Sequence, residues 1–177
     1  MRRLRGDFDD EFREFVVGAQ ARVLRFAELL VGDRGVAEDL AQHGFAKAYA
    51  AWPTLRVGSP EQYVRRCVRN ASTDRWRRGG WRETATASLP ERADVDPHAA
   101  TLERDMVLRA LSTLDAVERS VIVLRYYNDL PETEIAAELG IPAGTVKSTA
   151  SRALRKLRAS VDAVPAPAAD QTQGAKP

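Results

Sequence analysis

Two short amphipathic segments separated by a tight turn, at residues 133–157, limit the possible folds more than any other feature of this sequence. Apolar residues recur at helical steps on both sides of the turn: Ile135, Ala136 and Leu139 before it, and Val146, Ala150, Ala153, Leu154 and Leu157 after it. Gly140 can adopt the positive φ that such a turn requires, and Ile141 can fill the angle between the helices. The spacing predicts a helix-turn-helix, with a plain helical hairpin as the alternative.

The second helix of this motif is strongly basic, because the sequence from Thr145 to Arg158 has five bases and no acid. In a helix-turn-helix, the second helix lies in the major groove of DNA with its N-terminal residues at base edges. The candidate DNA contacts are polar residues at its start and off its apolar face: Thr145, Lys147, Ser148, Ser151, Arg152 and Arg155. Such side chains contact phosphates and donate hydrogen bonds to guanine, so the helix is predicted to bind duplex DNA. In a plain hairpin, the same face would only be solvated.

Apolar residues at the helical period predict three more helices in the N-terminal half of the chain. The first spans about residues 7–31. The second begins near Gly35 and is expected to stop at Pro53, which cannot continue a helix. The third begins at Pro60 and closes at the glycine pair that ends with Gly80. These helices form an expected domain of about 80 residues.

The segment 83–98 lacks a helical period and contains two prolines, so it is predicted to be a flexible linker. It divides the chain into helical domains at 7–82 and 99–160, and 161–177 is predicted to be a disordered tail. The first helix after the linker has its expected apolar face at Leu102, Met106, Leu108, Leu111 and Leu114. The sequence therefore predicts an all-α chain of two small domains.

The third N-terminal helix is the second basic block of the chain. Residues 56–82 have eight arginines against two acids, whereas residues 7–39 have nine acids against four bases. Opposite its apolar face lie Arg65, Arg66, Arg69, Asn70, Trp76 and Arg77. Interleaved arginine and tryptophan suit single-stranded nucleic acid, because guanidinium groups follow phosphates while indole faces stack on bases. For Trp76, packing at the domain edge is the alternative.

Several other function classes are disfavoured by composition. Cys67 is the only cysteine, and His43 and His98 lack the spacing of metal ligands, so no disulfide and no metal site is expected. No carboxylate cluster or nucleophile–base pair points to a catalytic residue, and no cofactor is expected. No apolar run reaches the roughly 20 residues that span a bilayer, and the basic N-terminus is not followed by an apolar segment. A cytoplasmic protein is therefore expected, without membrane insertion.

Both domains resemble the sigma-70 family of bacterial transcription factors. The stretch from Leu102 to Leu157 resembles sigma region 4, above all in Glu118–Tyr127, Glu134–Ala136 and Gly144–Ser148. The stretch Ala37–Gln42 resembles region 2.2, and Tyr63–Arg78 resembles regions 2.3 and 2.4. Two such domains without a region 3 between them resemble the extracytoplasmic-function group. Within it, Leu29–Asp33 and Pro60–Arg66 resemble the actinobacterial sigma-E-like subgroup.

The resemblance implies a transcription initiation factor and not an enzyme. The implied contacts with the clamp helices of the polymerase β′ subunit are Glu38, Asp39, Gln42, Ala46 and Tyr49, on the polar face of the second helix. The third helix would recognise and open the −10 promoter element, and the helix-turn-helix would read the −35 element near the β flap. The implied partners are core RNA polymerase and promoter DNA, with an anti-sigma factor as a further candidate.

One departure from the family pattern lies on the second helix. His43 stands where the family usually has an acid, and Gly44 follows it inside the helix. A glycine in mid-helix costs about 0.5–1 kcal/mol relative to alanine. The expectation is a contact with core polymerase that is weaker than typical, or one that is pH-sensitive through His43; the alternative is a tolerated surface substitution.

Two rivals from other classes stay open at this point. A one-component repressor would use only the helix-turn-helix and would bind operator DNA without polymerase, but it leaves the basic third helix unexplained. A nuclease would need a metal-ligand set or a nucleophile with its base. Transcription with core polymerase separates these three classes.

Overall fold

The computed structural model describes residues 5–55, 58–79 and 99–162. Over these residues the chain forms eight α-helices: α1 (Arg5–Val31), α2 (Arg34–Ala50), α3 (Trp52–Leu55), α4 (Pro60–Gly79), α5 (Ala99–Ser112), α6 (Ala116–Tyr126), α7 (Glu132–Leu139) and α8 (Ala143–Asp162). The all-α class is confirmed. The predicted linker at 83–98 lies outside the described residues, as does the predicted tail apart from its first two residues, which belong to α8.

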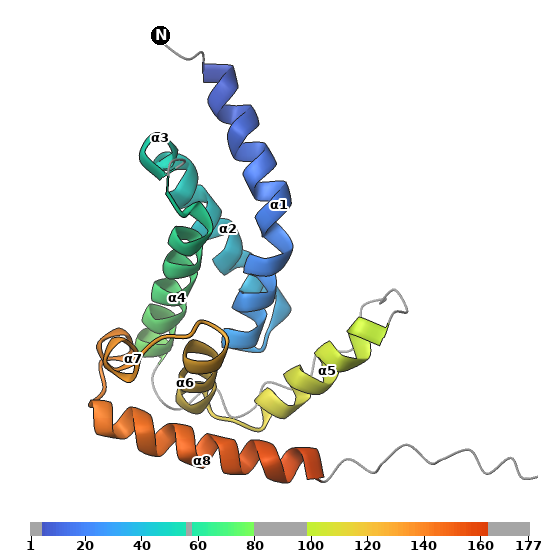
Figure 1. Cartoon of the computed structure of the whole chain (residues 1–177), viewed down its shortest axis with the longest axis vertical. Helices are drawn as coiled ribbons and strands as arrows, with labels where there is room; N and C mark the ends of the chain where they lie inside the picture. Colours follow the sequence, from blue (N-terminus) through green and yellow to red (C-terminus); the bar gives the residue numbers. More distant parts are fainter. Residues whose placement is uncertain (1–4, 56–57, 80–98, 163–177) are drawn as a thin grey trace, which may run out of the picture.

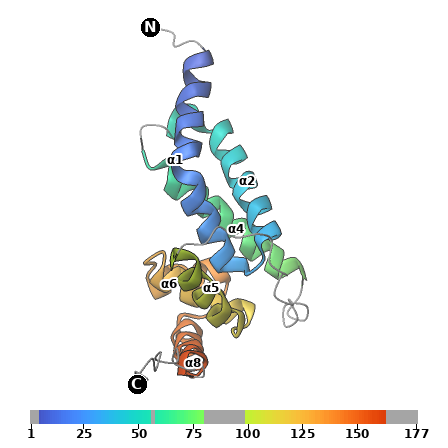
Figure 2. The same ribbon diagram turned by 90° about the vertical axis from the view of Figure 1, so that its right-hand side faces the viewer.

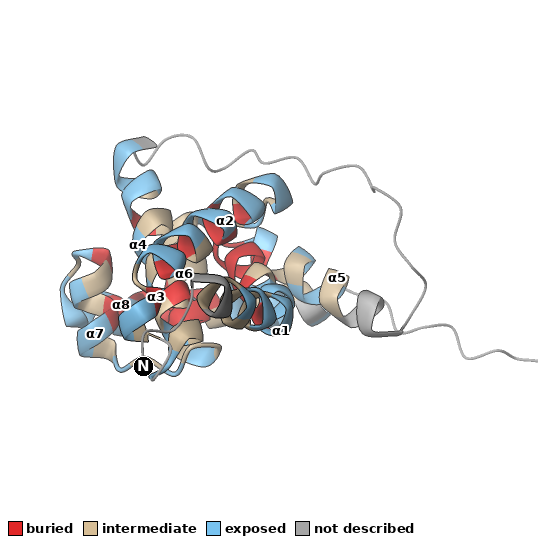
Figure 3. Cartoon of the chain, turned by 90° about the horizontal axis from the view of Figure 1, so that it is seen from above, coloured by how far each residue is buried: buried red, intermediate tan, exposed pale blue. Residues whose placement is uncertain are grey.

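Helices α1, α2 and α4 pack together as the N-terminal unit (Figures 1 and 2). Asp33 begins α2 because its side chain accepts a hydrogen bond from the Val36 backbone N–H at 2.8 Å. The core between the helices is apolar and buried, with Val23, Phe26, Ala27, Ala37, Val64 and Val68 all at 0% exposure. Figure 3 shows the buried residues of these helices where they meet and the exposed ones outside.

Gly44 is buried where α2 crosses α4. A Cβ atom there would lie 3.0 Å from Val64 Cγ1 and 3.2 Å from the Val64 carbonyl oxygen. This glycine therefore permits close helix packing and is not part of the exposed face. The expectation that Gly44, like His43, is a surface substitution is therefore wrong for Gly44. The sequence of α2 alone does not show that α4 packs across this position.

The end of α2 also differs from the prediction. The helix ends at Ala50, and Pro53 lies inside the short helix α3 that follows. Trp52 of α3 is buried and packs edge-on against Phe12, with ring centroids 5.0 Å apart. The chain therefore turns after Ala50, before Pro53, and Trp52 packs on α1 at this turn.

The C-terminal unit contains the predicted helix-turn-helix, formed by α7 and α8. Gly140 ends α7 with φ 66°, and the Ile141 backbone N–H donates to the Ala136 carbonyl oxygen at 3.1 Å, as in a helix C-cap. Val146, Ala150 and Ala153 of α8 are buried. The prediction is confirmed for this motif. The predicted apolar face of the first helix after the linker is wrong at Met106 of α5, which is 45% exposed.

The two units also pack on each other, with α6 against α1 and α7 beside the end of α4 (Figure 1). Arg119 of α6 donates through Nη1 to the carbonyl oxygen of Val31, the last residue of α1, at 2.9 Å. The next residue, Gly32, has φ 73°, and a Cβ there would lie 2.2 Å from Arg119 Nη1. Burial lowers the pKa of Arg119, and its three carbonyl acceptors (Val31, Leu111 and Leu114) replace water around the charge.

Candidate nucleic-acid interface

One candidate surface is the polar face of α8. Its apolar face packs on α6 and α7, which turns the opposite face outward. Five of the six predicted DNA contacts lie on it with exposed side chains and no acidic residue beside them in α8: Thr145, Lys147, Ser148, Ser151 and Arg155. The Ser148 hydroxyl donates to the Thr145 carbonyl oxygen at 3.1 Å, and the Ser148 side chain is exposed.

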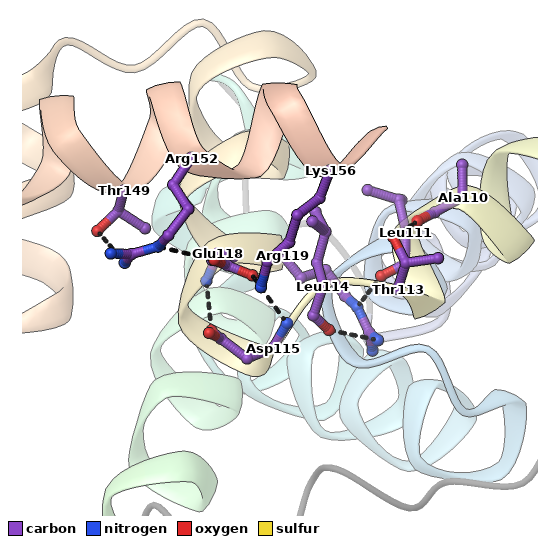
Figure 4. A network of polar contacts seen from close by, with 10 residues as sticks. All are labelled: Ala110, Leu111, Thr113, Leu114, Asp115, Glu118, Arg119, Thr149, Arg152 and Lys156. Carbon is purple, nitrogen blue, oxygen red and sulfur yellow. Dashed lines mark hydrogen bonds and ion pairs between the residues drawn. The ribbon is translucent and has the colours of Figure 1, made fainter. Parts of the chain in front are cut away.

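The sixth predicted contact, Arg152, is held by a buried carboxylate. Its Nε donates to Glu118 Oε1 at 2.9 Å, and Lys156 Nζ donates to Glu118 Oε2 at 2.7 Å (Figure 4). The Glu118 side chain is 1% exposed, whereas that of Arg152 is 54% exposed. Arg152 therefore ties α8 to α6 with its Nε edge and keeps only part of its guanidinium toward solvent.

Glu118 also anchors the start of α6. It forms a capping box with Asp115, in which each side chain accepts from the other's backbone N–H. Burial raises the pKa of Glu118, but hydrogen bonds from Lys156, from the Asp115 backbone and from Arg152 outweigh burial, and the pKa lies below its ordinary value. Sequence reasoning missed this residue as part of the site. The Asp-x-x-Glu spacing before an apolar run was the signal that could have found it.

The second candidate surface is α4. The structure brings all six residues predicted to bind single-stranded DNA onto this one helix, but it does not expose them equally. Arg66, Asn70 and Arg77 are exposed and Trp76 is half-buried. The side chains of Arg65 and Arg69 are only 20% and 12% exposed. The difference arises because the C-terminal unit covers one edge of α4.

Arg65 lies beside a stacked pair of aromatic rings from different units, whose centroids are 6.0 Å apart. Its Cζ is 5.6 Å from the ring centroids of both Phe26 in α1 and Tyr127 at the end of α6. Its Nη2 donates to Glu61 Oε1 at 2.8 Å. Hydrogen bonds from Arg22, and then from Arg65, keep the pKa of Glu61 below its ordinary value although burial opposes them. These contacts fix the first turns of α4.

Glu138 of α7 contacts the middle and the end of the same helix. Its Oε1 is 2.9 Å from Arg69 Nε, and its carbonyl oxygen accepts from Arg77 Nη2 at 3.2 Å. The Asn70 amide faces the same carboxylate, where its nitrogen can donate to Glu138 Oε1 at 2.5 Å and to the Arg66 carbonyl oxygen at 3.1 Å. Together, Glu138, Arg69, Asn70 and Arg77 form what we call the α7–α4 contact. No sequence pattern indicates it, because 61 or more residues separate Glu138 from Arg77 and Arg69.

The third candidate surface is the polar face of α2. All five residues predicted to bind polymerase are exposed on it: Glu38, Asp39, Gln42, Ala46 and Tyr49. Glu38 accepts from Arg34 at 2.9 Å, and the Tyr49 hydroxyl donates to Asp9 Oδ1 of α1 at 2.7 Å. His43 is exposed beside them. The face is polar and lies along one helix, and its residues are exposed to solvent among the parts of the chain that the structure describes.

Comparison with known proteins agrees with this arrangement. The family model of sigma-70 region 2 matches residues 16–82, and that of sigma-70 region 4 matches residues 104–157. The RNA polymerase sigma-E factor of Streptomyces coelicolor is 39% identical over 149 residues, which cover 84% of each chain. The chain belongs to the sigma-70 family of RNA polymerase sigma factors.

Further relatives agree with the extracytoplasmic-function (ECF) group. The ECF RNA polymerase sigma factor SigL of Mycobacterium tuberculosis is 34% identical over 142 residues, covering 76% of this chain and 79% of SigL. Among solved structures, the sigma factor RpoE in complex with the anti-sigma factor NepR from Bartonella quintana superposes with a TM-score of 0.57 at 27% identity. That match covers 86% of this chain and 97% of RpoE. CnrH in complex with the cytosolic domain of CnrY gives 0.53 at 26%, covering 86% and 88%. The resemblance to the ECF group is thus confirmed.

Proposed function

We propose that this sigma factor reads two promoter elements with two separate basic helices. Helix α8 would bind the −35 element as duplex, and α4 would bind the −10 element as it opens. The observation that carries the proposal is the pairing of two cationic helix faces in one chain, each backed by its own buried apolar face. Phosphate contacts would supply most of the affinity, and side chains at the start of α8 would read bases.

The exposures of the side chains divide the work within α8. We propose that Thr145, Lys147, Ser148, Ser151 and Arg155 contact the −35 duplex directly, because they are exposed on the face opposite the core. Arg152 would act mainly as a positioning residue through Glu118, with its solvent-facing edge on a phosphate. For Arg152 we therefore favour a phosphate contact over a base contact.

For α4, the proposed −10 contacts are Arg65, Arg66, Arg69, Asn70, Trp76 and Arg77. Three of them are exposed in this structure, and Arg65 and Arg69 are largely covered by the C-terminal unit. Stacking of unpaired bases on Trp76 would add to the phosphate contacts of the arginines.

On α2, the exposed residues Glu38, Asp39, Gln42, Ala46 and Tyr49 are the proposed contacts with the β′ clamp helices of core polymerase. The factor itself would carry out no catalysis and would act where the polymerase works, in the cytoplasm. Among the residues that the structure describes, no helix is long and apolar enough to cross a membrane.

An anti-sigma factor is a proposed further partner. The two solved relatives are sigma factors bound to NepR and to the cytosolic domain of CnrY. Their resemblance over 86% of this chain supports a similar mode of control here.

The test is transcription from genomic DNA with core polymerase and the purified chain, followed by sequencing of the transcript 5′ ends. We expect starts that share a −10 and a −35 element and that disappear without the chain. A protein that binds duplex DNA equally well without polymerase and starts no transcripts would be a repressor instead. Cleavage of the template would indicate a nuclease.

A further inference from the structure

One edge of the α4 face that carries the proposed −10 contacts is contacted by the chain's own helix α7, which leaves the Arg69 side chain only 12% exposed. We propose that Glu138 occupies the place of promoter DNA on α4 and thereby keeps the free factor closed. The −10 face then becomes available only when the two units separate. This inference rests on the proposed role of α4 in binding the −10 element.

The chemistry of the α7–α4 contact resembles that of a nucleic-acid contact. The Glu138 carboxylate faces Arg69, its carbonyl oxygen accepts from Arg77, and the Asn70 amide faces the same carboxylate. The Arg69 contact is an ion pair in which the Nε–H is not aimed at the carboxylate, whereas Arg77 donates a hydrogen bond through Nη2. A phosphate would compete with Glu138 for the positive charge of Arg69 and for this donor of Arg77. Three proposed DNA contacts are therefore engaged by one residue.

Burial and composition make the contact specific to this helix. The side chains of Arg69 and Glu138 are 12% and 17% exposed, so salt screens their attraction less than that of a surface pair. Helix α7 has three glutamates and no base. At its C-terminal end, a Cβ atom on Gly140 would lie 2.7 Å from Arg77 Nη2. The Arg77 guanidinium therefore lies directly against the backbone at the end of α7.

The closed arrangement affects the two promoter-reading helices differently. The proposed −35 face of α8 stays exposed, because α8 packs on α6 and α7 with its opposite side. The −10 face is covered along one edge, and Arg66 remains exposed on the other. The free chain would therefore contact DNA through α8 alone. A second contact between the units, the stacking of Tyr127 on Phe26, lies beside Arg65 and also holds the closed form, without contacting Glu138.

The first experiment measures the distance between the units in the full chain. Spin labels are placed by Gln20→Cys in α1 and Ala159→Cys in α8, both exposed, in a Cys67→Ala background. Pulsed electron–electron double resonance should give one narrow distance distribution for the parent chain. Glu138→Arg should add a population at longer distances, because it places a third cation beside two arginines.

The matched control is Glu134→Arg, an equal charge reversal at an exposed position of the same helix. It should leave the distribution narrow. A charge swap, Arg69→Glu with Glu138→Arg, should restore the parent distribution and so exclude simple misfolding of α7. An unchanged distribution in the Glu138→Arg chain, or equal broadening in the control, overturns the proposal.

The second experiment measures whether release of Glu138 uncovers a DNA face. Fluorescence anisotropy follows binding of a labelled oligothymidylate of about 20 nucleotides, which has no base pairs to open. Glu138→Gln should tighten binding about 5- to 10-fold, as expected when loss of one largely buried charge pair raises the open fraction. Glu134→Gln makes the same change in net charge and should have less than a roughly twofold effect.

Equal tightening by both variants would reduce the effect to net charge and would overturn the masking of α4 by Glu138. The proposed function is tested separately, by transcription with core polymerase. If the parent chain starts no transcripts in that test, the proposed function is wrong, but the closing role of Glu138 is not affected. The distance measurement uses neither polymerase nor DNA and still decides whether Glu138 closes the chain.

Discussion

Replacing Arg152 with alanine should destabilise the helix-turn-helix unit and weaken binding to all −35 sequences by a similar factor. The structure gives the reason, since Arg152 Nε donates at 2.9 Å to Glu118, whose side chain is 1% exposed. A buried carboxylate that loses a donor retains its desolvation penalty. Helix α8 would then lose one of its two ionic ties to α6, the other being Lys156.

The magnitude follows from the exposure of the two partners. A hydrogen bond to a charged group contributes about 1.5–3 kcal/mol. Arg152 is 54% exposed, so water replaces part of the lost donor, and Lys156 and the Asp115 backbone N–H still serve the other Glu118 oxygen. We expect a loss of about 1–2 kcal/mol, which lowers the Tm of a chain of this size by about 2–8 °C.

The assay combines thermal unfolding by circular dichroism with binding to a panel of −35 variants. Arg155→Ala is the matched control, because it removes the same charge from an exposed position of α8. The double variant of Glu118→Gln with Arg152→Ala should be less destabilised than the sum of its single variants. An unchanged Tm for Arg152→Ala, together with a loss confined to one base pair, would refute this reasoning and make Arg152 a base reader.

Three further outcomes are expected. Gly44→Val should lower the free energy of unfolding by about 1–3 kcal/mol in urea titrations, because the added atoms meet the backbone of α4. Asp39→Arg with Gln42→Arg should weaken binding to core polymerase in pull-down titrations while the Tm stays unchanged, since both residues are exposed. The folded-state pKa values of Glu61 and Glu118 lie below the ordinary value of about 4.5. The stabilisation from these two carboxylates should therefore be fully present above about pH 4.5, and the free energy of unfolding should fall as the pH drops below it. The fall should be smaller in Glu118→Gln.

The helices and the helix-turn-helix could be predicted from the sequence because their signals are local. Apolar residues at the helical period define the buried face of α8, and Gly140 supplies the left-handed cap that ends α7. The candidate DNA residues lie on α4 and α8 as expected, since a helical wheel needs only the spacing within one element, and their contact with DNA stays a prediction. The chemistry within each helix was therefore accessible without tertiary information.

What could not be predicted depends on partners distant in the sequence. A helical wheel puts Arg152 off the apolar face but does not show that Glu118, 34 residues earlier, lies beneath it. Gly44 looks like a defect when only its own helix is considered, and its use becomes visible at the crossing with Val64. In both cases, local propensity is overruled by a contact between helices.

The α7–α4 contact has a consequence for what drives opening. Arg69 and Arg77 would exchange one anionic or polar oxygen of Glu138 for phosphate oxygens, so these two side chains alone gain little from the exchange. A ligand shifts such an equilibrium only by the difference between its affinities for the open and closed forms. That difference has to come from groups that the closed form does not satisfy. On the −10 side, the exposed Arg66 is such a group, because it can gain a phosphate contact when DNA binds. The polar face of α2 is already exposed in the closed form, so core polymerase bound there favours opening only if it also holds the two units apart. Promoter DNA without polymerase should therefore open the chain less than core polymerase does.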